Sequence, residues 1–93
     1  MKIIQSRTFE RKVKKLNSSQ KAQLDDAVRC ILKNPEAGEG KKGDLKGVFV
    51  YKFHVDTTLY LLAYRFNEEI LELIMLGPHE NYYRSLKNYL GDR

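Results

Sequence analysis

The sequence contains little cysteine and no long apolar run, and each shortage excludes a class of protein. Cys30 is the single cysteine, so no disulfide framework can form, which fits a reducing compartment. No stretch reaches the roughly 18 uninterrupted apolar residues that a membrane-spanning helix needs. The N-terminal residues also lack the apolar core of a signal peptide. We therefore expect a cytoplasmic protein that makes no membrane contact.

Motifs for metals, cofactors and nucleophilic catalysis are equally scarce. His54, His79 and Cys30 are the only soft metal ligands, and none of them falls at C-x-x-C or H-x-x-x-H spacing. Residues 38–43 match G-x-G-x-x-G, but a helical pattern precedes them and a strand pattern follows, the reverse of a dinucleotide site. No serine stands in a G-x-S-x-G elbow. We expect no metal and no other cofactor.

The chain is short and basic. Its 93 residues suffice for one domain, residues 1–93, and are too few for a doubly wound or barrel enzyme. Lysine and arginine total 17 against 12 acidic residues, a net charge of +5. Such a surplus on a small domain suits nucleic-acid binding, although charge that only keeps the protein soluble is the plain alternative.

Apolar spacing predicts a short strand followed by two helices. The strand covers residues 2–7, and the first helix carries Phe9, Val13 and Leu16 at helical spacing. Asn17 ends this helix and caps the next one, in a capping box with Gln20. The buried face of the second helix comprises Leu24, Ala27, Val28 and Ile31, and the helix ends at Asn34–Pro35.

After a loop over residues 34–47 the apolar period changes from 3.6 to two. Strands are predicted over 49–55, 59–66 and 70–76, and their short polar links indicate an antiparallel meander. The first strand is expected at an edge or beside the last meander strand. Gly77–Pro78 breaks the sheet, and a terminal helix carries Tyr82, Leu86, Tyr89 and Leu90.

The predicted order is β-α-α-β-β-β-α, an α+β fold. Its two N-terminal helices pack on one face of a small antiparallel sheet, whose other face stays partly open, and a C-terminal helix follows.

Strand alternation divides the sheet residues between two faces. Aromatic side chains dominate one face: Phe49, Tyr51, Phe53, Tyr60, Tyr64 and Phe66. If that face meets the helices, Lys52, His54 and Arg65 project together from the other face. His79 and Tyr83, spaced i,i+4 at the last helix, extend this set.

These residue types suit cleavage of a phosphodiester without a metal. Two histidines can share the proton transfers, while Lys and Arg stabilise charge on the phosphorane and Tyr stacks on a base. The plain alternative is a solvated polar face with no chemistry.

Several short stretches resemble one family when they are taken in order. They are Ser6–Arg11, Leu45–Gly47, Val50–His54, Tyr60–Arg65 and Gly77–Arg84. Together they resemble the RelE/ParE superfamily of bacterial toxins from type II toxin–antitoxin modules. The resemblance implies an endoribonuclease that cuts mRNA on the ribosome and so inhibits translation.

The resemblance also implies which residues form the catalytic site. Lys52 and His54 match two basic positions on the first meander strand, His79 a position before the last helix, and Tyr83 the tyrosine of that helix. Leu61 stands where family members often have arginine. Arg65, roughly 13 Å along the strand, is the candidate replacement. The RNA- and ribosome-binding candidates are Arg11, Lys12, Lys14, Lys15, Lys41, Lys42 and Lys46.

Two other functions remain open at this point. The ParE-like branch inhibits DNA gyrase and needs no such catalytic set, and a basic nucleic-acid-binding domain without catalysis is a third reading. The toxin reading predicts three partners: the ribosome, mRNA, and a small acidic antitoxin that forms a hetero-oligomer with the toxin. The net charge of +5 would speed the encounter with an acidic partner.

Overall fold

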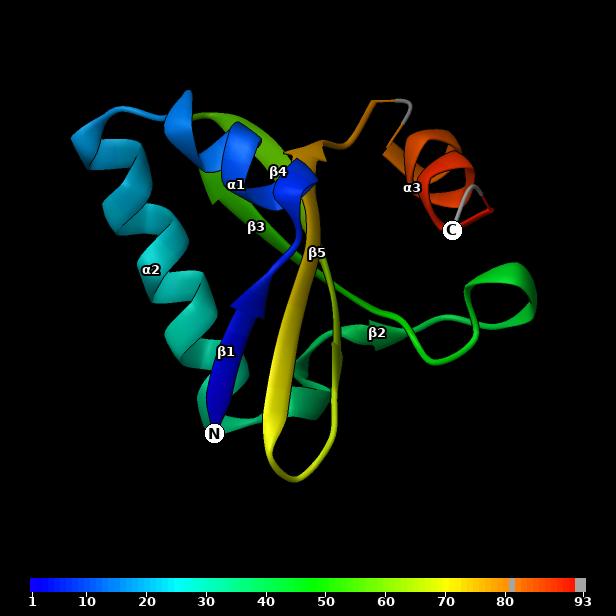
Figure 1. Cartoon of the computed structure of the whole chain (residues 1–93). Coiled ribbons are helices and arrows are strands. Elements are labelled where there is room, and N and C mark those ends of the chain that lie inside the picture. The colour runs from blue at the N-terminus through cyan, green and yellow to red at the C-terminus, as the bar shows by residue number, and fades with distance from the viewer. Residues whose placement is uncertain (81, 92–93) are drawn as a thin grey trace.

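The chain forms three layers in a computed structural model that describes residues 1–80 and 82–91. The elements are β1 (Lys2–Gln5), α1 (Arg7–Lys14), α2 (Ser18–Lys33), β2 (Glu39–Gly40), β3 (Phe49–Val55), β4 (Thr58–Phe66), β5 (Ile70–Pro78) and α3 (Tyr82–Gly91). Helices α1 and α2 lie on one side of the sheet and α3 lies on the other (Figure 1). None of the described helices is both long enough and apolar enough to cross a membrane.

The sheet has the order β1-β5-β4-β3-β2 and is mixed. The α+β class, the meander and the place of β1 beside β5 at an edge are confirmed. The purely antiparallel sheet is wrong, because β1 runs parallel to β5, with Lys2 opposite Ile70. No tight turn joins these two strands, so their relative direction is not fixed by a hairpin.

One strand was not predicted. Residues 39 and 40 form β2 inside the expected loop, with Glu39 opposite Val50 and Gly40 opposite Phe49. The two-residue length of β2 leaves the outer part of β3 without a neighbour on that side. Beyond Val50, β3 is therefore a free edge of the sheet.

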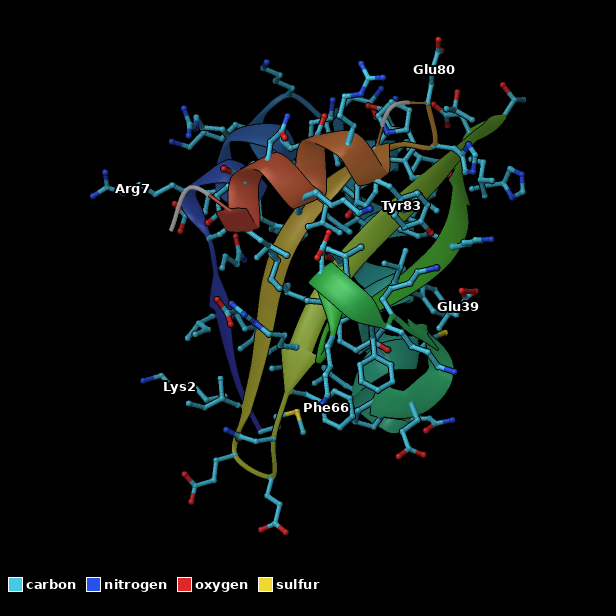
Figure 2. The ribbon with its side chains drawn as sticks, turned by 90° about the vertical axis from the view of Figure 1, so that its right-hand side faces the viewer. Lys2, Arg7, Glu39, Phe66, Glu80 and Tyr83 are labelled. Atoms are coloured by element: carbon cyan, nitrogen blue, oxygen red, sulfur yellow. The ribbon has the colours of Figure 1, made fainter. Side chains whose placement is uncertain are left out.

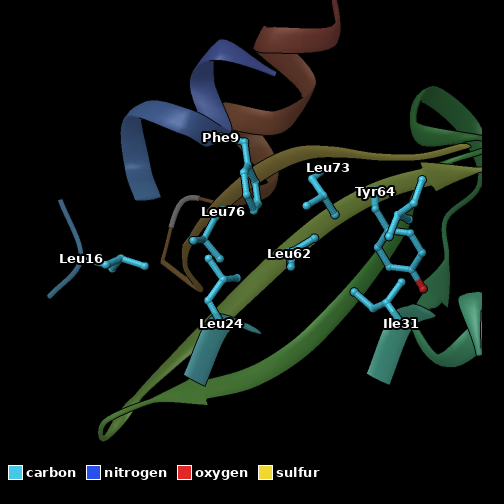
Figure 3. Close-up of a cluster of buried hydrophobic side chains, with 9 residues drawn as sticks. Phe9, Leu16, Leu24, Ile31, Leu62, Tyr64, Leu73 and Leu76 are labelled. Atoms are coloured by element: carbon cyan, nitrogen blue, oxygen red, sulfur yellow. The ribbon is translucent and has the colours of Figure 1, made fainter. Parts of the chain in front are cut away.

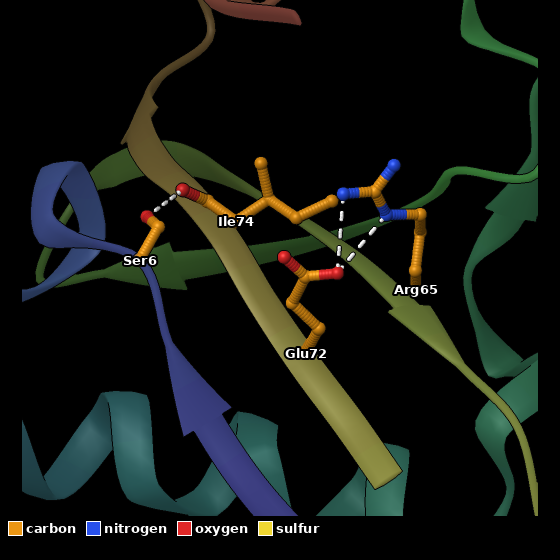
Figure 4. A network of polar contacts seen from close by, with 4 residues as sticks. All are labelled: Ser6, Arg65, Glu72 and Ile74. Carbon is orange, nitrogen blue, oxygen red and sulfur yellow. Dashed lines mark hydrogen bonds and ion pairs between the residues drawn. The ribbon is translucent and has the colours of Figure 1, made fainter. Parts of the chain in front are cut away.

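Side-chain caps fix where the first two helices begin. The Ser6 oxygen accepts a hydrogen bond from the Phe9 N–H at 3.0 Å, and its hydroxyl donates to the Ile74 carbonyl of β5 (Figure 4). The predicted capping box of α2 is confirmed, with Asn17 and Gln20 bonded reciprocally at 2.8 and 3.0 Å. Ser6 thus ties the start of α1 to the sheet as well as capping it.

The larger core lies between the sheet and helices α1 and α2, on what we call the helix-pair face. Phe9, Leu16, Leu24 and Ile31 from the helical side meet Leu62, Tyr64, Leu73 and Leu76 of the sheet (Figure 3). Partly buried aromatic residues surround them, including Phe49, Tyr51 and Phe53. The prediction that the aromatic face of the sheet meets the two N-terminal helices is confirmed.

The opposite face, which we call the α3 face, is only partly open. Leu61 and Ala63 are fully buried there and pack with Ile74 and with Leu86 of α3. These residues are buried because β4 and β5 contain near-continuous apolar runs, which are typical of strands buried on both faces. The open part includes β3, where Lys52 and His54 are exposed.

Candidate functional site

The exposed residues of β3 lie next to the segment that connects β5 to α3. Lys52 is opposite Leu61, and His54 is opposite Leu59. The His79 N–H donates to the Leu59 carbonyl at 3.0 Å, so His79 continues the pairing of β5 with β4. Because neighbouring strands lie about 4.8 Å apart, the backbones of His54 and His79 flank Leu59 at roughly 10 Å from each other.

The start of α3 differs from the prediction. β5 continues to Pro78, and α3 begins at Tyr82, so His79 lies before the helix rather than one turn from Tyr83 within it. The buried Tyr82 hydroxyl donates to the Met75 carbonyl at 2.6 Å, which fixes the first turn of α3 to β5. Burial raises the pKa of Tyr82 far above its ordinary value. The helix extends to Gly91.

Tyr83 contacts Lys41, the residue that follows β2. The Lys41 ammonium lies 4.8 Å from the centre of the Tyr83 ring, a cation–π contact. The same nitrogen donates to Glu39 Oε1 at 2.6 Å. Figure 2 shows Tyr83 on α3 and Glu39 on the same side of the molecule. The site therefore includes β2, which the sequence prediction left in a loop.

Glu39 and Lys41 shift each other's pKa. The hydrogen bond and the positive charge of Lys41 lower the pKa of Glu39, and the charge of Lys52 adds to the effect. The hydrogen bond to Glu39 raises the pKa of Lys41, and the nearby Tyr83 hydroxyl contributes in the same direction. Lys41 therefore stays a cation at neutral pH, and Glu39 stays an anion.

A core tyrosine holds β2 in place. The Tyr64 hydroxyl donates to the Pro35 carbonyl at 2.6 Å and accepts from the Gly38 N–H at 2.9 Å. A Cβ on Gly38 would lie 2.7 Å from that hydroxyl oxygen and 3.1 Å from the Val50 backbone, so glycine is needed for the close approach. Burial raises the pKa of Tyr64. The position of Glu39 and Lys41 thus depends on a residue of the larger core.

The hairpin that carries His54 is attached to α2. Asp56 sits at the β3–β4 turn with φ of 56°, and its carboxylate accepts hydrogen bonds from Gln20 and Gln23 at 3.1 and 3.0 Å. The Asp56 N–H donates to Gln23 Oε1 at 2.7 Å. The two side-chain bonds, Gln23 first, lower the pKa of Asp56. His54 also lines a hollow of about 260 Å³ with Cys30 and Tyr51, at the free edge of β3.

Arg65 lies on the α3 face but not among these residues. It is opposite Glu72, and its Nε and a terminal nitrogen both lie 3.1 Å from Glu72 Oε1 (Figure 4). Arg65 is four positions along β4 from Leu61, the partner of Lys52. Arg65 is therefore paired with Glu72, and it lies away from His54 and His79.

The RNA-binding candidates fall into two places. Arg11, Lys12 and Lys15 line a hollow beside α1, and Lys14 is exposed on the same helix. Lys41 contacts Tyr83, while Lys42 and Lys46 are exposed on either side of a short 3₁₀ turn, Gly43–Leu45. Among the described residues, no group of three or more His, Cys, Asp or Glu could hold a metal ion.

The sequence did not predict Glu39 as part of the site, and it predicted Lys41 as an RNA-binding residue rather than a member of this group. The available signal was their spacing of two residues just before a strand, which places both side chains on one face if the segment is extended. We call the group Lys41, Lys52, His54, His79 and Tyr83 the basic strip; Lys52, His54 and His79 are exposed, and Lys41 and Tyr83 are half-buried. The strip offers imidazoles, fixed cations and an aromatic ring, the groups that phosphate chemistry requires.

Comparisons with known proteins agree with the fold and the order of these elements. A profile of the ParE-like toxins of type II bacterial toxin–antitoxin systems matches residues 3–87. The chain therefore belongs to this toxin family. A comparison with curated protein sequences gave no match.

Solved structures show the same fold at low sequence identity. A chain of the intact E. coli RelBE toxin–antitoxin complex is 20% identical, with 85% of this chain and 96% of that chain covered and a TM-score of 0.68. A substituted E. coli RelE in the free state is 18% identical, with 92% and 90% covered and a TM-score of 0.71. The YoeB/ParE toxin from Agrobacterium tumefaciens is 20% identical, with 85% and 99% covered and a TM-score of 0.66.

Proposed function

We propose that this toxin is an endoribonuclease that cuts mRNA on the ribosome and thereby stops translation. The observation that carries the proposal is the placement of His54 and His79 on either side of Leu59, with Lys52 two residues from His54 on β3. Two imidazoles that can take up and release a proton, spaced to flank a phosphodiester, are what RNA cleavage without a metal needs.

The proposed reaction is attack of the ribose 2′-oxygen on the adjacent phosphorus. One histidine takes the proton from the 2′-hydroxyl, and the other gives a proton to the departing 5′-oxygen. The new P–O bond and the broken one leave a 2′,3′-cyclic phosphate and a 5′-hydroxyl. Lys52 and Lys41 stabilise the charge that develops on the phosphorane, because preorganised cations act where the charge grows.

Tyr83 has a positioning role in this scheme. Its ring lies against Lys41 on one side, and tyrosine rings commonly stack on unpaired RNA bases. Glu39 holds Lys41 at this place through the 2.6 Å hydrogen bond. We leave Arg65 out of the catalytic set, since it lies opposite Glu72, four positions along β4 from Leu61 and away from His54 and His79.

The same proposal includes a cytoplasmic location and an inhibitor. One of the similar structures is the RelBE complex of a toxin with its antitoxin. We propose that this chain likewise forms a hetero-oligomer with a small acidic antitoxin, to which its net charge of +5 is complementary. A neighbouring reading frame with no acidic product would count against this partner.

A second function competes with the first. The matching family profile is that of ParE-like toxins. The resemblance described above implies DNA gyrase as the target of that branch. Leu61 at a position where nuclease members often have arginine favours the same branch. Gyrase inhibition would not require the basic strip.

Induction of the protein in a bacterial host separates the two functions. Pulse-labelling of protein synthesis and mapping of transcript ends are followed from the first minutes, together with an SOS reporter. The nuclease predicts an immediate loss of translation with cleaved transcripts. A prompt SOS response with translation at first intact would favour gyrase inhibition instead.

A further inference from the structure

A second basic surface lies on the other side of the β5–α3 connection, and the proposed reaction does not use it. A hollow of about 390 Å³ separates α1 from the end of β5 and the beginning of α3. We call it the α1 hollow. This volume is at the lower end of the range for pockets that hold small ligands.

One wall of the α1 hollow is a cationic stripe on the first helix. Thr8, Arg11, Lys12 and Lys15 line it, and their spacing of i, i+3, i+4 and i+7 places them on one side of the helix. Phe9, Val13 and Leu16, on the other side, pack into the larger core. The first helix is therefore divided between an apolar side and a side that faces the hollow with three positive charges.

The opposite wall is mostly apolar. Met75, Leu76 and the buried Tyr82 form its floor, and the exposed residues Pro78 and Ser85 form part of its rim. Glu80 is the one carboxylate that lines the hollow among the residues that the structure describes. In residues 1–80 and 82–91, none of the three cations of the stripe takes part in an ion pair. The hollow therefore has a positive rim, an apolar floor and a surplus of cations.

We propose that the α1 hollow binds one nucleotide of a single-stranded RNA. Arg11, Lys12 and Lys15 contact its phosphate, for which the forked guanidinium of arginine is well suited. The base or ribose lies on the apolar floor formed by Met75 and Leu76. This inference rests on the proposed function, because it takes RNA as the ligand.

The hollow and the basic strip lie on two sides of one short segment. Gly77, Pro78 and Glu80 line the hollow, while His79, between them, pairs with Leu59 beside the strip. A nucleotide in the hollow is therefore not the one that is cut. It belongs to the RNA that flanks the cleavage point, and its binding anchors that RNA beside His79.

The test measures binding without cleavage. A fluorescent twelve-nucleotide RNA of mixed sequence, fully 2′-O-methylated so that it lacks the attacking hydroxyl, is titrated with the full chain at salt concentrations from 50 to 200 mM. The hollow variant is Lys12→Gln with Lys15→Gln. The matched control, Lys21→Gln with Lys33→Gln, removes the same charge from exposed positions of α2. Ser85→Leu fills the hollow without changing its charge, and thermal melts confirm that each variant folds.

We expect the hollow variant to weaken binding about tenfold and to reduce the slope of log K against log salt by about 0.7, the value for one lost phosphate contact on a single strand. The control pair should weaken binding less than threefold, and Ser85→Leu should weaken it at least fivefold. Equal weakening by both double variants would overturn the proposal, because it would show only a general effect of charge. A ten-residue polyglutamate peptide is the second control. The proposal would also be overturned if this peptide displaces the RNA from the wild-type chain and loses as much affinity for the hollow variant as the RNA does.

The result is independent of the nuclease proposal. His79→Ala should abolish toxicity and leave binding of the methylated RNA within twofold. If His79→Ala stays toxic while the hollow variant loses RNA, the nuclease proposal fails and the hollow stands. If His79→Ala is harmless to cells while the hollow variant binds RNA normally, the hollow proposal fails alone.

Discussion

The two faces of the sheet consist of the same alternating strands, but only one of them leaves charged residues exposed. On the helix-pair face, the 16-residue α2 covers β3 as well as the centre of the sheet. On the α3 face the 10-residue α3 covers β4 and β5, which bury Leu61 and Ala63, and leaves Lys52 and His54 of β3 exposed. At about 1.5 Å per residue the difference is roughly 9 Å of helix. Because α3 is shorter than α2, it leaves Lys52 and His54 of the basic strip uncovered.

The largest expected effect is on activity and comes from the exposed side. His79→Ala removes a proton-transfer group, and such a loss typically slows the reaction about 10²- to 10⁴-fold. Stability should change by less than about 0.5 kcal/mol, because His79 is exposed. Single-turnover cleavage rates and thermal melts measure the two quantities. Arg65→Ala, on the same face, should lower the cleavage rate less than threefold, and a hundredfold loss there would return Arg65 to the catalytic set.

A substitution on the helix-pair face should have the reverse effect. Phe9 is 1% exposed and packs at the centre of the larger core. Phe9→Ala should lower the free energy of unfolding by about 3–5 kcal/mol, which urea denaturation measures. The control Lys21→Ala, at an exposed position of α2, should change it by less than about 0.5 kcal/mol. Loss of activity from Phe9→Ala with unchanged stability would contradict the division between the faces.

Tyr64→Phe tests the connection between the two faces. It leaves the part-buried Pro35 carbonyl and Gly38 N–H without their partner, and a hydrogen bond of this kind contributes about 0.5–1.5 kcal/mol. Because the same hydroxyl places β2, the rate of cleavage should fall at least tenfold at a temperature where the variant is fully folded. Full activity in the folded variant would show that β2 is not needed by the strip.

The smallest effect concerns pH and the hairpin of His54. The hydrogen bonds from Gln23 and Gln20 hold the pKa of Asp56 below its ordinary value of 3.8. Since the folded pKa is the lower one, this stabilisation is complete above the unfolded value and is lost as the pH falls through the folded value. Asp56→Asn, which tolerates the positive φ, should therefore melt below wild type at pH 6, and the two should converge below pH 4. A difference that is the same at pH 6 and pH 3 would contradict this assignment.

The local patterns of the sequence predicted the parts of the fold that depend on neighbouring residues. The alternation in β3 and β4 placed Tyr64 and Lys52 on opposite faces, and the spacing of Asn17 and Gln20 predicted the capping box. Both signals operate over a few residues, so tertiary structure did not need to be known.

The missed features depend on contacts between distant residues. β2 exists because the Tyr64 hydroxyl holds Gly38, 26 positions away in the chain. The pairing of Arg65 with Glu72 depends on the strand register, which shifts between Ala63 and Tyr64. The start of α3 is set by the bond from Tyr82 to Met75. None of these three contacts leaves a periodic signal in the sequence. The catalytic role of the basic strip stays a prediction.

We propose that the basic strip cuts RNA through its two histidines. The most direct measurement is a single-turnover reaction on ribosomes programmed with an end-labelled mRNA, with analysis of the chemical ends of the products. We expect wild type to form a 2′,3′-cyclic phosphate and a 5′-hydroxyl, and we expect the reaction to be at least a hundredfold slower in His54→Ala and in His79→Ala. Equal cleavage by all three proteins, or intact mRNA with wild type while DNA gyrase is inhibited, would contradict it.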